Sequence, residues 1–150
     1  MNIKFLKSSE KKKLLAELEE QFGITKLNYL LLETGKEKIR GFSGTMTKEE
    51  IKELGEIANV EIIGLYLIKK ERKLRLSLDA THTLKDQITK NIIEINNNQL
   101  EDWLRGKNLE IVKDGGVHVI KCGDDFIGCG ISDGKKLINH VPKERRIRSS

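Results

Sequence analysis

The sequence predicts an α+β fold in which a small N-terminal α/β domain packs on a small C-terminal β-barrel. In residues 1–88, helical periodicity alternates with apolar runs, which is typical of helices layered on a mixed or antiparallel sheet. In residues 89–150, short apolar runs are separated by glycine turns, which is typical of a small barrel. No linker rich in proline or serine separates the two halves, so we expect them to pack together.

Two helices are predicted in the first half from their end signals. Ser8 or Ser9 is placed to cap the first helix, and Gly23 to end it. The second helix opens with Thr47 and Glu50, whose spacing is that of a capping box. The predicted buried faces are Leu14, Leu15, Leu18 and Phe22 in the first helix, and Ile51, Leu54, Ile57 and Ala58 in the second.

The strands of the first half form two predicted hairpins. Residues 27–33 turn back to pair with residues 38–42. Residues 60–68, the most apolar stretch, form a central strand that turns into residues 74–78, where leucines alternate with polar side chains. Residues 79–90 fit either a helical turn or a connecting loop.

The second half begins with a predicted strand over residues 91–95. Asn98 then caps a short helix over residues 99–104, with Glu101 at the reciprocal capping position. Trp103 is expected to anchor this helix in the core. The remaining barrel strands are predicted over residues 109–112, 117–122, 126–129 and 137–141.

The composition fits a soluble globular protein with a polyanionic partner. The 150 residues are 37% hydrophobic and 34% charged, and the net charge is +5. All of this net charge resides in residues 134–150, which hold six basic residues and one acidic residue. A second basic cluster occupies residues 69–75. Such concentrated charge suggests a polyanionic partner such as nucleic acid, and the alternative is a solvated tail that aids solubility.

Membrane and secretory classes are not expected. No apolar run approaches the roughly 20 residues that a membrane span needs. The N-terminus has no long apolar segment of the secretory kind, so we expect a cytoplasmic protein whose two cysteines are reduced.

Three motifs near the C-terminus carry a family resemblance. They are Trp103-Leu104-Arg105-Gly106, then Gly128-Cys129-Gly130 with Gly134, then Asn139-His140-Val141-Pro142-Lys143 followed by Arg145 and Arg146. In these motifs the chain resembles the PUA-like RNA-binding domain appended to rRNA cytosine methyltransferases of the Fmu/Sun family. As a whole it is similar to small archaeal stand-alone ribosome-biogenesis proteins that join an N-terminal α/β (pre-PUA-like) domain to a PUA-like domain.

The resemblance implies RNA binding, with rRNA as the partner, in ribosome biogenesis or rRNA modification. It implies no methyl transfer, because the methyltransferase domain is missing, and we therefore expect a non-catalytic protein. The alternative is an adaptor that docks on an RNA methyltransferase or a pre-ribosomal protein. Candidate RNA-binding residues are Arg105, Lys107, Lys121, Lys135, Lys136, Asn139, His140, Lys143, Arg145, Arg146 and Arg148.

No metal, cofactor or catalytic residue is predicted. His118, Cys122, Cys129 and His140 match no standard zinc spacing, and neither cysteine has a neighbour that would make it a nucleophile. The glycines of residues 128–134 lack the following helix of a dinucleotide loop. A tight barrel turn is the better interpretation, and a place where RNA backbone approaches closely is the alternative.

Overall fold

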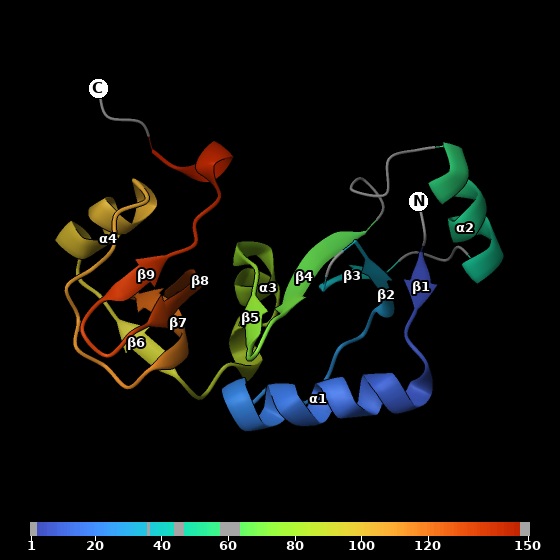
Figure 1. Cartoon of the computed structure of the whole chain (residues 1–150), viewed down its shortest axis with the longest axis horizontal. Helices are drawn as coiled ribbons and strands as arrows, with labels where there is room; N and C mark the ends of the chain where they lie inside the picture. Colours follow the sequence, from blue (N-terminus) through green and yellow to red (C-terminus); the bar gives the residue numbers. More distant parts are fainter. Residues whose placement is uncertain (1–2, 36, 44–46, 58–63, 148–150) are drawn as a thin grey trace.

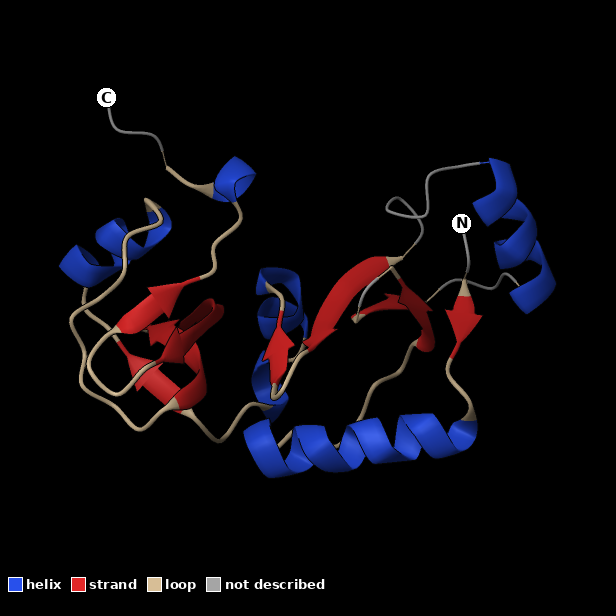
Figure 2. Cartoon of the chain, in the orientation of Figure 1, coloured by secondary structure: helices blue, strands red, loops and turns tan. Residues whose placement is uncertain are grey.

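The computed structural model describes residues 3–35, 37–43, 47–57 and 64–147 as two halves that lie side by side (Figure 1). Each half is built on its own sheet, with the short helix α3 (Leu78–Thr83) between the two sheets (Figure 2). Among the described residues, no helix combines the length and the apolar character required to cross a bilayer.

The first sheet is antiparallel, with the strands in chain order from β1 to β5. Within the described residues its strands are β1 (Lys4–Phe5), β2 (Leu30–Thr34), β3 (Lys38–Phe42), β4 (Leu65–Lys70) and β5 (Leu74–Leu76). The long helix α1 (Ser8–Phe22) packs on one face of this sheet, and α2 (Lys48–Ile57) lies near the β1 edge (Figure 1).

The second sheet is mixed, in the order β6-β7-β8-β9. Its described strands are β6 (Ile92–Glu94), β7 (Gly116–Cys122), β8 (Asp125–Ser132) and β9 (Leu137–Asn139). β6 and β7 are parallel, and the crossover between them carries α4 (Asn97–Leu104). Short 3₁₀ turns η2 (Lys85–Gln87) and η3 (Lys143–Arg145) complete the fold.

One hydrophobic core joins the two halves. The cluster that begins with Leu18 and Phe22 of α1 continues through α3 to Val119 and Phe126 of the second sheet. A buried hydrogen bond also crosses between the halves, because the Gly128 N–H donates to the Thr81 hydroxyl at 3.1 Å. A second cluster on the other face of the second sheet is centred on Trp103, which is fully buried as predicted.

The predicted ends of the two helices in the first half are largely confirmed. Gly23 ends α1 in the left-handed conformation, with φ 86°. Thr47 and Glu50 form the predicted capping box. The N-cap of α1 is Lys7, not a serine, because the Glu10 carboxylate accepts from the Lys7 N–H at 3.1 Å and closes the first turn one residue earlier.

The first predicted strand begins later than expected, at Leu30. The preceding segment buries Ile24 and Leu27 but forms no strand, and a side chain bonds part of its backbone. The N–H groups of Thr25 and Lys26 donate to the Gln87 side-chain oxygen at 3.0 and 2.9 Å. The return strand over residues 38–42 is confirmed.

The second hairpin of the first half is confirmed with shorter strands. β4 begins at Leu65, and the predicted positions 60–63 lie outside the described residues, as does Ala58 of the second helix. The return strand ends at Leu76 because the Ser77 hydroxyl accepts from the Ala80 N–H and starts α3. Residues 79–90 are therefore mostly helical.

Two expectations in the second half were wrong in detail. Asn96, not Asn98, caps α4, and Gln99 takes the reciprocal position. The predicted strand over residues 109–112 is reduced to one bridge between Leu109 and Leu137.

The predicted barrel is an open sheet in the structure. Residues 128–132 belong to β8 and do not form a turn. Gly130 is needed there because a Cβ would lie 2.6 Å from the Trp103 ring. The turn comes at Asp133, whose carboxylate accepts from two backbone N–H groups.

Candidate nucleic-acid interface

A cleft of about 560 Å³ opens between the two halves. Strands β3, β4 and β5 supply one wall, the segment after β9 supplies the other, and α3 and β8 meet at its base. We call it the basic cleft after its positively charged and aromatic lining residues, which are Lys38, Arg40, Tyr66, Lys69, Arg75, His140 and Arg145. Its acidic lining residues are Asp79 and Glu144.

Strand register places the basic side chains of the first wall on one face of the sheet. Lys38 lies directly opposite Lys69, and Lys69 lies opposite Arg75 on the next strand. Side chains opposite each other in an antiparallel pair share a face, and like charges in that position are destabilising by roughly 0.2–1 kcal/mol. Glu71 offsets part of this repulsion by pairing with Lys69 at 3.6 Å and Arg75 at 3.4 Å. No described carboxylate lies within ion-pair distance of Lys38, so an anionic ligand would relieve the repulsion that remains.

Tyr66 stands among these cations. The Lys38 ammonium lies 5.5 Å and the Arg40 guanidinium 5.8 Å from the centre of its ring. Burial raises the pKa of Tyr66 above its ordinary value of 10.0, and the neighbouring Arg75 only partly opposes this effect. The phenol therefore stays protonated at neutral pH and is able to donate a hydrogen bond.

His140 joins the two walls of the cleft. Its ring Nδ1 is hydrogen-bonded to the Arg75 guanidinium, which has only N–H donors, so Nδ1 accepts and the ring proton resides on Nε2. Partial burial lowers the pKa of His140, and the charges of Arg75 and Lys69 lower it further, whereas Glu71 raises it. The imidazole is thus held neutral next to a guanidinium.

The second wall is the segment after β9, which is folded onto the protein. Pro142 opens the η3 turn, and the Ile147 N–H donates to the Leu104 carbonyl at 2.8 Å. Arg145 pairs with Asp79 at 3.2 Å across the cleft base. The basic segment through residue 147 is therefore ordered and is not a loose tail.

Of the residues predicted from sequence, His140 and Arg145 line the basic cleft. Lys143 is exposed on the same 3₁₀ turn, and Arg148 lies outside the described residues. Arg146 has an internal role, since its Nε donates to the Val141 carbonyl at 2.9 Å and its side chain packs over Gly106.

Asn139 is also engaged within the protein. Its side-chain amide donates to the carbonyls of Trp103 at 2.7 Å and Lys107 at 2.9 Å, and its Oδ1 accepts from the Val141 N–H at 2.7 Å. With these three bonds it ties the end of α4 to the end of β9.

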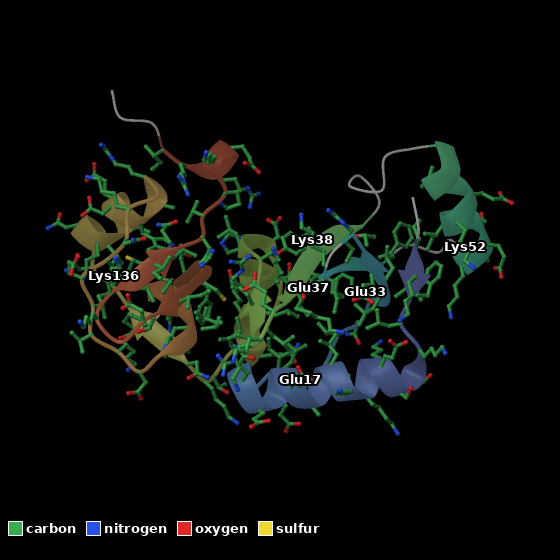
Figure 3. The ribbon with its side chains drawn as sticks, viewed as in Figure 1. Glu17, Glu33, Glu37, Lys38, Lys52 and Lys136 are labelled. Atoms are coloured by element: carbon green, nitrogen blue, oxygen red, sulfur yellow. The ribbon has the colours of Figure 1, made fainter. Side chains whose placement is uncertain are left out.

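The other predicted cations lie away from the cleft. Arg105 and Lys107 pair with acidic side chains of α4, at 2.8 and 3.6 Å. Lys121 lies over the Phe126 ring. Lys135 follows β8, and Lys136 next to it lies at the far end of the second half from Lys38 (Figure 3).

The first wall was missed as a binding surface. Lys69 and Arg75 belong to a basic cluster visible in the sequence, whereas Lys38 and Arg40 lie in the predicted strand over residues 38–42, which was not considered as a binding surface. Their alternation with the fully buried Ile39 was the available signal, since it places both on one face of the strand.

The residues weighed as a zinc set are engaged elsewhere or buried. His118 is bonded to the Asp114 carbonyl at 2.8 Å, and His140 to Arg75. Cys129 is buried, and Cys122 contacts Asn97. Across the described ranges, no three His, Cys, Asp or Glu side chains are arranged to hold a metal ion.

The two cysteines are expected to differ sharply in reactivity. Burial raises the pKa of the Cys129 thiol to about 12, so almost no thiolate exists at pH 7.5. Cys122 is partly exposed. We expect iodoacetamide to label Cys122 of the folded protein and to leave Cys129 unlabelled, as read by peptide mass spectrometry. The Cys122→Ser variant should then remain unlabelled until it is unfolded, and labelling of folded Cys129 would contradict the assignment.

His140 should contribute a pH dependence to stability. Because its pKa is lower in the folded protein than its ordinary 6.5, the unfolded chain takes up this proton first as the pH falls. The free energy of unfolding should therefore decrease as the pH drops below 6.5 and level off below the folded-state pKa. Urea unfolding of the wild type and His140→Gln between pH 7.5 and 5 tests this. The variant should show a weaker decrease, and identical profiles would show that His140 does not titrate in this way.

Comparison with known proteins agrees with the motifs in the second half. Residues 90–147 match the family described as the PUA domain of the methyltransferase RsmF. The whole fold is similar to that of a conserved PUA domain protein from Thermoplasma acidophilum, with a TM-score of 0.62, 14% identity, and coverage of 92% of this chain and 93% of that chain. No curated protein matches the chain. Residues 90–147 therefore form a PUA-like domain related to that of the Fmu/Sun family, as predicted.

Proposed function

We propose that this chain is a non-catalytic RNA-binding protein that holds RNA across the basic cleft. The observation that carries the proposal is the convergence of Lys38, Arg75 and Arg145 on one cleft from both halves of the molecule. Neutralising phosphates at such a cleft releases counterions, which drives binding of a polyanion. PUA domains are generally RNA-binding, and this favours RNA among the possible polyanions.

The RNA in this proposal is ribosomal, and the protein acts in the cytoplasm during ribosome biogenesis or rRNA modification. The similarity of residues 90–147 to a methyltransferase PUA domain supports the choice of ribosomal RNA and of this process. A methyltransferase or a pre-ribosomal protein is a further partner in the same proposal. No reaction is assigned to the chain, and its buried Cys129 thiol is a poor nucleophile.

Fluorescence anisotropy at several salt concentrations tests the proposal. The probes are structured rRNA fragments, a single-stranded RNA and a duplex DNA of equal length. A structured RNA should bind more tightly than the other two, and the difference should persist as salt rises. Equal binding of all three, abolished by salt, would reduce the cleft to a non-specific polyelectrolyte surface. Tight capture of a protein partner would then favour the adaptor function.

A further inference from the structure

We infer that the basic cleft receives one unpaired nucleotide of the bound RNA, with its base on the apolar floor and its phosphates at the cationic wall. This inference rests on the proposed function and specifies which part of an RNA the cleft recognises. Three features of the cleft lead to it, namely its size, its apolar floor and the hydrogen-bonding groups at its edge.

The size of the cleft excludes a duplex. A volume of about 560 Å³ lies within the range of pockets that enclose a single small molecule. A paired helix keeps its bases inside and its phosphates outside, so it can only lie across the mouth of such a cleft. An unstacked nucleotide that swings out of a loop or bulge is able to enter.

The floor of the cleft has the chemistry of a base-binding surface. It is formed by Leu78 of α3 and Ile127 of β8, and Leu76 and Val141 of the two walls add to its apolar lining. Leu78 is partly exposed, and the other three are buried. Phosphate neutralisation alone does not require apolar residues in the lining. The flat face of a nucleobase, in contrast, gains from contact with apolar and aromatic groups.

The edge of the cleft offers fixed hydrogen-bond donors. The Arg75 guanidinium is held between Glu71 and His140. Because Nδ1 of His140 is used to accept from Arg75, the proton at Nε2 makes this atom a donor. Fixed donors next to an apolar floor match a base edge, which carries carbonyl oxygens and ring nitrogens that accept hydrogen bonds.

Two RNA hairpins that differ only by one bulged nucleotide test the inference with the full chain. We expect the bulged hairpin to bind about tenfold more tightly, since base stacking and edge contacts are added to the phosphate contacts. A 2-aminopurine at the bulge should change its fluorescence on binding, whereas the same probe in the stem should not.

Two histidine variants distinguish recognition of a single nucleotide from general electrostatic attraction of RNA. His140→Ala should lose most of the preference for the bulged hairpin. His82→Ala is the matched control, because His82 is exposed on α3 and does not line the cleft, and it should keep the preference. Retention of the full preference in His140→Ala would overturn the role given to this residue.

The outcomes distinguish this inference from the proposed function. If both hairpins bind equally and the bulge probe does not respond, while reversing the cleft charge weakens both, the nucleotide site is overturned and RNA binding in the cleft stands. If neither hairpin binds more tightly than duplex DNA, the proposed function is overturned together with the inference.

Discussion

Replacing Lys38 and Arg145 together by glutamate is expected to weaken RNA binding about 100-fold at ~0.1 M salt. The two side chains lie on opposite walls of the basic cleft and come from different halves of the chain. Each reversal removes one phosphate contact and adds a repulsion, which we estimate at about tenfold per position. The slope of log Kd against the logarithm of the salt concentration should also become shallower by about two, because two phosphate contacts are lost.

The fold should tolerate these two substitutions. Lys38 has a like-charged neighbour in Lys69, so its reversal removes a repulsion. Arg145 is exposed, and its reversal replaces a surface ion pair with Asp79, worth about 0–1 kcal/mol, by a solvent-screened repulsion. A loss of affinity in this variant therefore reports on binding and not on unfolding, and thermal melting of the same samples checks the point.

A matched variant shows whether location or net charge is responsible. Lys12→Glu with Lys13→Glu changes the charge by the same amount on the exposed side of α1, away from the cleft. Its affinity should fall less than about threefold. Equal losses in the two double variants would mean that RNA responds only to net charge, and the cleft would no longer be the binding surface.

The sequence was informative where one local interaction decides the structure. Gly23 ends a helix because a residue after the last turn needs a positive φ, and this requirement is visible without tertiary context. Thr47 and Glu50 close their capping box within four residues. At Asn96 and Asn98 the local pattern is ambiguous, because each has a Gln or Glu three residues later. In the structure the earlier asparagine is the cap.

Strand pairing in the second half was not predictable from apolar runs. Residues 109–112 have the composition of a strand, yet only Leu109 pairs, and Val112 remains 81% exposed. In contrast, the glycines of β8 resemble turn residues in the sequence. Gly130 lies within β8, paired with β7 and β9, and a glycine is required there because the Trp103 ring, from a helix earlier in the chain, occupies the space of a Cβ. Such a contact leaves no periodic signal.

The basic cleft depends on tertiary structure in the same way. Sequence analysis placed the binding surface in the C-terminal segment, where basic residues are dense along the chain. The structure gathers cations that are far apart in the sequence, namely Lys38 of β3, Arg75 of β5 and Arg145 of η3. Only the register of β3, β4 and β5 reveals that several of these side chains share one face.

Asn139→Ala is expected to lower the free energy of unfolding by about 2–3 kcal/mol, although this residue was a candidate RNA contact. The substitution removes three side-chain hydrogen bonds. The Lys107 carbonyl loses its donor, whereas the Trp103 carbonyl still accepts from the Gly106 N–H at 3.0 Å. Each such bond contributes about 0.5–1.5 kcal/mol. For a chain of this size the melting temperature should fall by about 5–10 °C. Asn139→Asp should be at least as destabilising, because a carboxylate would face the same two carbonyls.

Binding measurements on the folded variant decide between a structural role and an RNA contact. If the amide only ties α4 to β9, Asn139→Ala at low temperature should bind RNA within about threefold of the wild type. A direct base contact would cost about tenfold or more. Asn98→Ala is the matched control for stability, since this asparagine is exposed and caps no helix, and its effect should stay within about 0.5 kcal/mol. If Asn139→Ala is stable but loses much of its affinity for RNA, Asn139 contacts RNA directly. The RNA-binding surface would then include the end of α4.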